Sequence, residues 1–202
     1  MQDKDLRVLI HDLRNRIAPI RNATLLLRLR GANDPQLQEM AALIDRQVQA
    51  MAELLEAAAP AAAASSEPVA PASPQVQKAA GAERTRRILI GDDSPAVCET
   101  LAAVLQDLGH EVRTANDGQE TVDAATAWMP DLVFLDINMP KLNGYEAARR
   151  LRSQFPSSAM RLVMISGADI DADVIAAARH AGFDECLDKL LDFEALKKAL
   201  AR

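Results

Sequence analysis

Residues 86–202 alternate five times between a short apolar run and a segment of helical length. The runs are RILIG (87–91), HEVRTA (110–115), DLVFLD (131–136), RLVMIS (161–166) and DECLD (184–188). The first, third and fourth runs are almost wholly apolar, as strands buried on both faces of a parallel sheet must be. The alternation predicts an α/β domain with a doubly wound, five-stranded parallel sheet over residues 86–202.

A segment rich in alanine and proline separates this part from the start of the chain. Residues 57–83 are mostly Ala, Pro, Ser and Gln, and four prolines within them exclude a continuous helix or strand. We therefore predict a multidomain chain with a helical region over 1–57, a flexible linker over 58–85 and the α/β domain over 86–202.

The residues before the linker follow the period of paired helices. Apolar or small side chains recur at alternating steps of four and three in two series, which are Leu6, Ile10, Leu13, Ile17, Ile20, Thr24 and Leu27, and Leu37, Ala41, Ile44, Val48, Met51, Leu55 and Ala58. Between the series, Gly31 is placed to end one helix and Asp34-Pro35 to begin the next. This pattern predicts an α-helical hairpin. Because two helices enclose little core, we expect two copies to pair into a four-helix bundle and form a homodimer.

The charge and composition narrow the class of partner. The net charge is −6, and all the acidic excess lies in residues 86–202. No basic nucleic-acid-binding module is present, and no apolar run is long enough to cross a membrane. We therefore expect a cytoplasmic protein with neither nucleic-acid nor membrane partners. Cys98 and Cys186 form no disulfide or metal-binding pattern.

Reactive side chains stand where the predicted strands end. Asp92 and Asp93 follow the first strand, Asp136 ends the third, Ser166 ends the fourth, and Lys189 follows the fifth. Ligands of such sheets bind beyond the carboxyl ends of the strands. Three carboxylates gathered there favour Mg²⁺, whose preferred ligands are oxygens. The lysine and the hydroxyl could hold phosphoryl oxygens while one aspartate attacks phosphorus.

This part of the chain resembles the receiver domain of response regulators. The motifs ILIGDDSP, VFLDINMPKLNGYE, VMISG and LDKLLD carry the resemblance, which covers residues 86–202 and implies a flavodoxin-like fold. It implies that Asp136 is phosphorylated and that Ser166 and Lys189 contact the phosphoryl group. It also implies an Mg²⁺ site formed by Asp93, Asp136 and the backbone carbonyl of Asn138, with Asp92 assisting through water.

Two positions depart from the receiver pattern. Leu190 follows Lys189 where the family usually has a cis proline, and because a cis bond before a residue other than proline costs roughly 3–4 kcal/mol, we expect a trans bond and a differently set loop. Cys186 stands where the family usually has an aromatic switch residue. We therefore expect the usual output switch on the last strand to be altered.

The stretch HDLRNRIAPIRNA resembles the H-box of the dimerisation and histidine phosphotransfer domain of sensor histidine kinases. This resemblance covers residues 1–57 and implies that His11 is a phosphorylated nucleophile. Asp12 would orient its ring, and Asn15 would bind phosphoryl oxygens or a hydrolytic water. By the heptad pattern, His11 and Asn15 face outward from the bundle. The arginines at positions 14, 21 and 28 repeat every seven residues, either as a solvated face or as a docking surface for the acidic receiver.

An isolated histidine on a helix surface usually has no chemical role. The neighbouring acid, the asparagine one turn later, the hairpin and the receiver in the same chain favour a functional role for His11. A complete kinase would need an ATP-binding domain after the hairpin, where the linker stands instead, so kinase activity is not expected. We likewise expect neither a sensor nor a DNA-binding output domain.

The leading hypothesis is a phosphorelay intermediate in two-component signalling. It would pass a phosphoryl group between His11, Asp136 and partners, namely a histidine kinase, other response regulators or phosphotransfer proteins. One alternative is a receiver-controlled adaptor or kinase inhibitor in which His11 is idle. Another is a phosphatase in which Asp12 and Asn15 position water against an aspartyl phosphate. The direction of transfer, and whether exchange is in cis, in trans or absent, are open at this stage.

Overall fold

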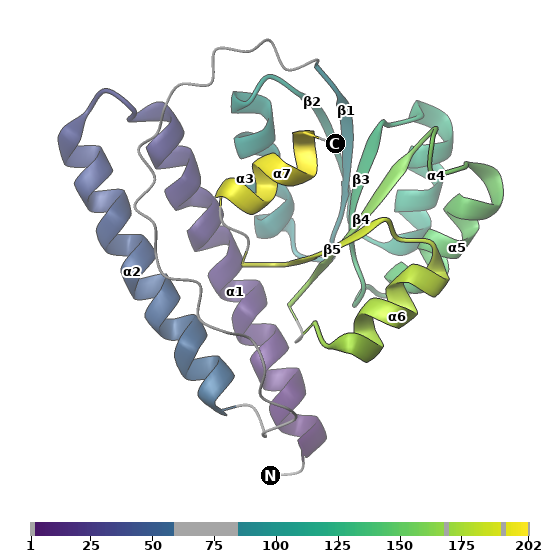
Figure 1. The fold of residues 1–202 in the computed structure, drawn as a ribbon, viewed down its shortest axis with the longest axis horizontal. Helices are drawn as coiled ribbons and strands as arrows, with labels where there is room; N and C mark the ends of the chain where they lie inside the picture. Colours follow the sequence, from purple (N-terminus) through teal and green to yellow (C-terminus); the bar gives the residue numbers. More distant parts are fainter. Residues whose placement is uncertain (1–2, 59–84, 168–169, 191–192, 202) are drawn as a thin grey trace.

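The α/β part of the chain folds as the alternation predicts. The structure is a computed structural model that describes residues 3–58, 85–167, 170–190 and 193–201. The predicted linker, 58–85, lies almost wholly outside the described residues. The described part contains a hairpin of two helices and a five-stranded sheet with helices on both faces (Figure 1).

All five strands run parallel, in the order β2-β1-β3-β4-β5. They are β1 (Arg87–Gly91), β2 (Glu111–Ala115), β3 (Leu132–Asp136), β4 (Arg161–Ser166) and β5 (Glu185–Asp188). The helices that follow them are α3 (Pro95–Asp107), α4 (Gly118–Trp128), α5 (Gly144–Gln154), α6 (Ala172–Ala181) and α7 (Phe193–Ala201). This is the flavodoxin-like order, so the predicted fold of the domain is confirmed.

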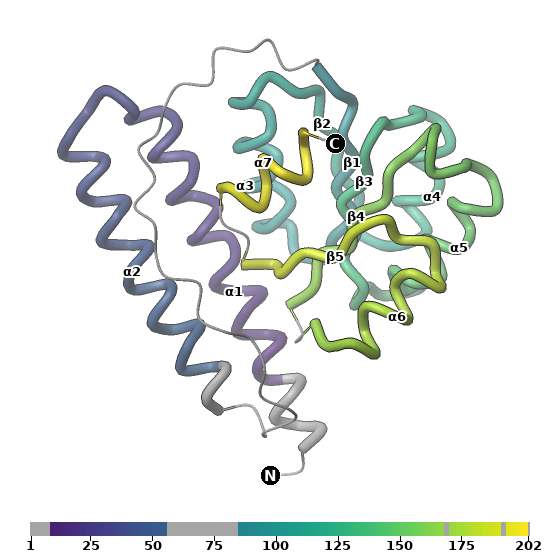
Figure 2. Tube along the Cα trace, in the orientation of Figure 1, coloured from purple at the N-terminus to yellow at the C-terminus, as the bar shows by residue number. Residues whose placement is uncertain are grey.

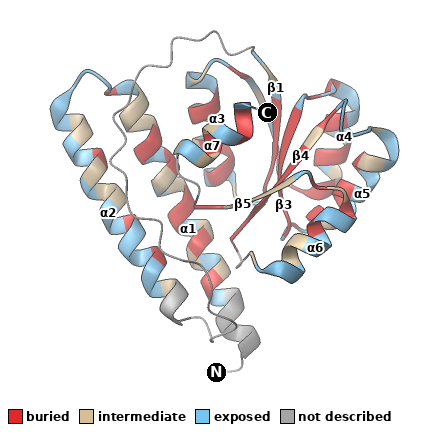
Figure 3. Cartoon of the chain, viewed as in Figure 1, coloured by how far each residue is buried: buried red, intermediate tan, exposed pale blue. Residues whose placement is uncertain are grey.

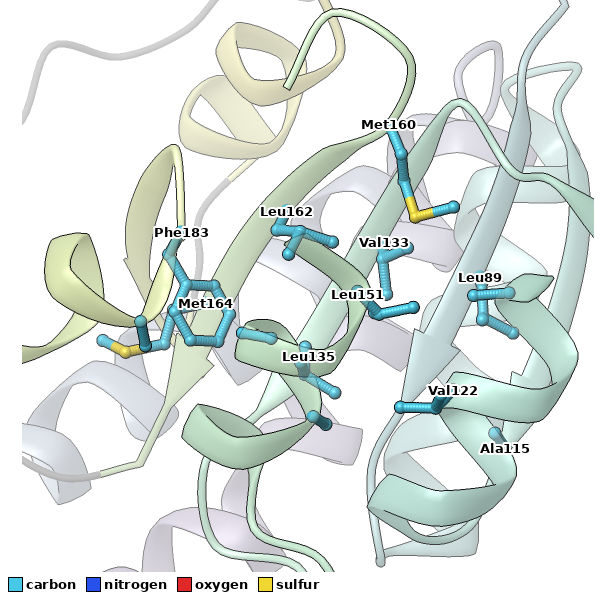
Figure 4. Packing of buried hydrophobic residues seen from close by; sticks show 14 of the residues in the cluster. Leu89, Ala115, Val122, Val133, Leu135, Leu151, Met160, Leu162, Met164 and Phe183 are labelled. Carbon is cyan, nitrogen blue, oxygen red and sulfur yellow. The ribbon is translucent and has the colours of Figure 1, made fainter. Parts of the chain in front are cut away.

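The near-continuous apolar runs are explained by two cores, one on each face of the sheet. Leu89 and Val133 point into the core under α4, α5 and α6 (Figure 4), whereas Ile88 and Phe134 point into the core under α3 and α7. Successive residues of a strand face opposite sides, so both parities must be apolar when both faces are covered.

The N-terminal hairpin consists of α1 (Asp3–Arg30) and α2 (Pro35–Ala58), side by side and antiparallel. The Gly31 N–H donates to the Leu27 carbonyl at 2.8 Å and ends α1. The Asp34 carboxylate accepts from the N–H groups of Gln36 at 2.9 Å and Leu37 at 3.3 Å, which caps α2. The turn predicted from the sequence is therefore present.

The first helix packs on the α/β domain of its own chain. The trace of α1 runs along α3, with α2 on its outer side (Figure 2). Leu25 of α1 joins the core under α3 and α7. A second apolar group, the interface cluster, joins the hairpin to the α/β domain, and its buried members are Ile17, Ala18, Val48, Ala52, Val97 and Leu190. Part of the seam expected to pair with a second copy is thus covered in cis.

The two helices differ in what surrounds them. Burial follows α1 along the side that faces α3, while most of α2 is exposed (Figure 3). Within the predicted seam Ile17 is buried, whereas Ile20 and Met51 are 47% and 49% exposed. The four-helix bundle of two copies stays a prediction.

Candidate functional site

Three carboxylates meet at the carboxyl end of the sheet, as the strand ends predict. Asp92 and Asp93 follow β1, Asp136 ends the neighbouring β3, and one oxygen from each lies within 4.8 Å of the others. Asp92 and Asp136 are buried, and Asp93 is more open to solvent. This arrangement concentrates negative charge at the carboxyl end of the central strands.

Lys189 reaches into the carboxylates from the end of β5. Its Nζ lies 2.8 Å from Asp92 Oδ2 and 3.2 Å from Asp136 Oδ2. Its backbone N–H donates to the Ser166 carbonyl at 2.8 Å, and Ser166 is itself buried at the end of β4. The structure therefore brings together the four strand ends that the sequence singles out.

The carboxylates have perturbed acidities. The pKa of Asp92 is raised to about 6, because burial outweighs the opposing charge of Lys189 and the nearby Asp136 charge adds to the rise. Burial and the charge of Asp136 also raise the pKa of Asp93, against the opposing effect of Lys189 and His11. Burial lowers the pKa of Lys189, but the two carboxylates outweigh it and raise that pKa overall. Burial, which disfavours the charged form of a carboxyl group, is thus the main cause of both raised carboxyl pKa values, and the charge of Asp136 adds to it.

This donor set fits Mg²⁺. Hard divalent cations prefer carboxylate oxygens. The pKa values of Asp92 and Asp93 are raised mainly by burial, with the charge of Asp136 adding to the rise, and a cation among the carboxylates would stabilise their charged forms. Asn138 lies two residues beyond Asp136, in the exposed part of the loop after β3. Asp136, Asp92 and Asp93 are therefore the residues that would hold the ion, with the Asn138 carbonyl beside them.

A glycine holds the loop against β3, the strand that ends in Asp136. The Gly144 N–H donates to the Ile137 carbonyl at 3.0 Å, and a Cβ on Gly144 would lie 2.2 Å from the Asp136 carbonyl oxygen. Only glycine allows α5 to begin so close to β3. The Ile137 N–H donates to Asp136 Oδ1 at 3.0 Å and fixes the carboxylate.

His11 lies against the loop that follows Ser166. A Cβ built on Gly167 would be 3.5 Å from His11 Cδ2 and 3.5 Å from Asn15 Oδ1. Asp12 Oδ1 lies 3.7 Å from His11 Nδ1. The sequence predicted that His11 faces outward from a bundle. That orientation in a bundle stays a prediction, and in this chain the α/β domain covers the face, so that the His11 side chain is only 17% exposed.

Two side chains of this face carry buried polar atoms beside Gly167. Among the described residues, neither His11 Nε2 nor Asn15 Oδ1 has a hydrogen-bond partner, although both are buried. His11 also lies close enough to Asp93 to affect its pKa. A histidine with a free nitrogen, an amide and an acidic cluster thus share one site between two parts of the chain.

The predicted row of arginines divides. Arg14 is buried, and its Nη1 donates to the Gly167 carbonyl at 3.0 Å. Arg21 donates to Gln49 on α2 at 3.3 Å, and Arg28 pairs with Asp45 on α2 at 2.6 Å. Of these three arginines, Arg14 alone has its hydrogen-bond partner in the α/β domain among the described residues. A seven-residue repeat shows that side chains share a face, but it does not show which neighbour covers each one.

The two departures lie in different surroundings. The backbone has no cis peptide bond among the described residues, so the bond before Leu190 is trans as expected. The side chain of Leu190 is buried in the interface cluster. Cys186 is half-buried and packs against the core under α4, α5 and α6. The sequence did not predict a role for Leu190 in holding the hairpin.

Comparisons with known proteins match the α/β part. The family model described as the response regulator receiver domain matches residues 88–201. Protein PilH of Pseudomonas aeruginosa is 38% identical over 114 residues, which cover 56% of this chain and 93% of that protein. The sensor histidine kinase RcsC of Salmonella typhi is 31% identical over 132 residues, covering 63% of this chain but only 13% of the kinase.

A solved structure shows the same fold. The chemotaxis protein CheY4 of Vibrio cholerae superposes with a TM-score of 0.55 at 28% identity, covering 59% of this chain and 98% of that one. None of the helices in the described part of the chain has the length and apolar character needed to cross a membrane.

Proposed function

The chain belongs to the response regulator receiver family, and from that premise we propose that it is a phosphorelay intermediate that passes a phosphoryl group between His11, Asp136 and partner proteins. A role in two-component signal transduction follows from its receiver domain. The observation that carries the proposal is the position of His11, which lies against Gly167, directly after Ser166 and beside the acidic cluster.

The chemistry of the exchange needs no external acid or base. An Asp136 carboxylate oxygen attacks the phosphorus of phospho-His11, the bond from phosphorus to Nε2 breaks, and its electron pair returns to Nε2. The Asp12 carboxylate near Nδ1 favours the tautomer with its proton there, so a neutral imidazole leaves. Lys189 and Ser166 bind phosphoryl oxygens. When bound, Mg²⁺ supplies positive charge that offsets the carboxylates and the phosphoryl group.

The partners follow from the same chemistry. Receiver domains interact with histidine kinases and other signalling proteins, so a kinase or a phosphotransfer protein is the proposed source or recipient of the phosphoryl group. A homodimer through the hairpin is also proposed, supported by four exposed apolar side chains on α2: Met40, Leu43, Met51 and Leu54. At 100° per residue these four lie within an arc of about 80° and form one stripe.

The test uses the different stabilities of the two phosphoryl bonds. Phosphohistidine survives alkali and is lost in acid, whereas an aspartyl phosphate is lost in alkali. We expect phosphoramidate to label both sites of the wild type, His11→Ala to lose the alkali-stable label, and Asp136→Asn to lose the alkali-labile one. If the wild type never carries an alkali-stable label, the relay fails and the adaptor with an idle His11 is favoured.

A phosphatase activity is a second candidate, supported by Asn15. Its amide oxygen is buried beside Gly167 with no hydrogen-bond partner among the described residues, where it could hold a water against phospho-Asp136. We expect Asn15→Ala to lengthen the lifetime of the aspartyl phosphate at least threefold if this activity operates. An unchanged lifetime would leave Asn15 no role in hydrolysis.

A further inference from the structure

We propose that the exchange between His11 and Asp136 takes place within a single chain, and that Arg14 is the positioning residue that seats α1 over the phosphorylation site. The inference rests on the proposed function and adds to it the identity of the phosphoryl acceptor. Its physical basis is an interface between the hairpin and the α/β domain that has an apolar core and three polar anchors, one of which is a buried arginine beside the reactive groups.

The apolar part of this interface is a shared core. Ile17 and Ala18 of α1 belong to the interface cluster together with Val97 of α3 and Leu190 of the loop after β5. Leu25, two turns further along α1, is buried in the core of the α/β domain itself. Burial of these apolar side chains removes them from water and stabilises the docked state, so docking in cis is a stable arrangement of the chain.

The polar anchors fix the position of α1 along its own axis. They lie eight residues apart: Arg14 on Gly167, Asn22 on Thr100 at 3.3 Å, and Arg30 on Asp107. The pair of Arg30 and Asp107 is bidentate: Arg30 Nε donates to Asp107 Oδ2 at 2.6 Å, and Arg30 Nη2 donates to Asp107 Oδ1 at 3.0 Å. A slide of α1 by one turn would break all three contacts at once. The register that brings His11 to the site is therefore specified.

Arg14 connects this register to the chemistry. Its side chain is 2% exposed, and it donates to the carbonyl of Gly167, the residue after Ser166. His11 lies three residues earlier on α1 and Asn15 one residue later, and both contact the same glycine position. A buried guanidinium needs acceptors around it, and the Gly167 carbonyl is one of them. Arg14 thus holds the reactive face of α1 against the loop that carries Ser166.

Leu190 makes this receiver surface complementary to its own hairpin. It stands directly after Lys189 and is buried against the cluster that contains Ile17 and Ala18. The surface covered by α1 is closed to the equivalent helix of another molecule while the hairpin is docked. His11 and Asp136 of the same chain therefore meet more often than those of separate chains.

A mixing experiment separates exchange in cis from exchange in trans. An Asp136→Asn chain is labelled on His11 with phosphoramidate, freed of donor, and mixed with a tagged His11→Ala chain that keeps Asp136. We expect no label on the tagged chain during the time in which wild-type phosphohistidine decays through Asp136. Transfer to the tagged chain at a rate within threefold of the wild-type decay would overturn the inference while leaving the relay itself intact.

The relay can fail separately from the inference. If phosphohistidine decays no faster in the wild type than in Asp136→Asn, the two residues do not exchange at all, and the proposed function falls together with the cis route. Measured at concentrations where the wild type is monomeric, a first-order decay that is independent of protein concentration supports the cis route, and a rate proportional to concentration contradicts it.

Arg14 is tested against an exposed arginine of the same helix. We expect Arg14→Ala to slow the decay of phospho-His11 through Asp136 at least tenfold, and Arg16→Ala to leave it unchanged. Arg14→Lys keeps a charged donor and is expected to restore part of the rate. Labelling of Asp136 by acetyl phosphate, which needs no hairpin, should not fall in Arg14→Ala. A fall in that labelling, or an unchanged exchange, would remove Arg14 from the proposed role.

Discussion

The two helices of the hairpin carry the same heptad pattern but lie in different surroundings. The α1 helix has Ile17, Ala18 and Leu25 buried against the α/β domain, and α2 keeps Met51 and Leu54 exposed. A heptad pattern identifies a helix face that needs a partner, but it does not identify the partner. In both helices the heptad face is largely covered within the chain, as at Ile17 of α1 and at Ala41 and Val48 of α2. The exposed stripe of α2 lies beside its heptad face and is what remains for a partner outside the chain.

The largest expected effect comes from placing a charge at a buried position of α1 and comparing it with the same change at an exposed position. Ile17→Asp would bury a carboxylate in the interface cluster, at a cost of about 3 kcal/mol in the free energy of unfolding, measured by urea denaturation. Ile20→Asp is the matched control, because Ile20 belongs to the same predicted seam but is exposed. It should cost less than about 0.5 kcal/mol. Equal costs for the two variants would contradict the docked position of α1.

The acidic site gives the next effect, through pH and Mg²⁺. Asp92 has a pKa of about 6 in the folded state against 3.8 as its ordinary value, so the folded protein binds this proton more tightly than the unfolded chain. Its contribution to stability is present below pH 4 and is lost as the pH rises through about 6. Because Mg²⁺ binds the ionised carboxylates, it should raise Tm by several degrees at pH 7.5 and by much less at pH 5.

The control for the metal effect is Asp136→Asn, which removes one ligand charge and should reduce the shift in Tm at pH 7.5 by more than half. A shift of the same size at both pH values would mean that the carboxylates of this site do not bind the ion. Calorimetry over the same pH range checks the sign independently.

The exposed stripe of α2 is tested through self-association of the chain. Met51→Asp with Leu54→Asp should weaken self-association at least tenfold, measured by sedimentation over a range of concentrations, because both side chains are exposed in the single chain. The free energy of unfolding at low concentration should change little. A monomeric wild type would show that a second copy does not cover this stripe.

The smallest effect is expected at the exposed end of α1. Arg30 pairs with Asp107, but it is 64% exposed, and solvent screens the pair. Arg30→Ala should therefore lower the free energy of unfolding only slightly in urea denaturation. A loss as large as that of Ile17→Asp would show that the ion pair, and not the interface cluster, holds the hairpin in place.

The sequence predicted the α/β domain closely because its information is local. Strand runs such as LVFLD are buried on both faces, and Asp92, Asp136 and Lys189 follow directly from where the strands end in a parallel sheet. The turn at Gly31 and Asp34 is local in the same sense.

The docking of α1 could not be predicted in this way. The contact between Arg14 and Gly167 joins residues 153 positions apart, and the period of α1 is satisfied equally by a second copy or by α3. The signal that could have indicated it is Leu190, an apolar residue in place of the usual proline, beside a lysine of the site. Taken from the sequence alone, Leu190 indicates only a trans peptide bond after Lys189.

The most direct measurement locks the hairpin in the docked position. Asn22 and Thr100 touch across α1 and α3, so cysteines at both positions should form a disulfide that staples the two parts together. We expect the oxidised Asn22→Cys/Thr100→Cys chain to transfer the phosphoryl group from His11 to Asp136 at least as fast as the same chain reduced with dithiothreitol. Loss of transfer on stapling, restored by reduction, would contradict a docked state competent for exchange.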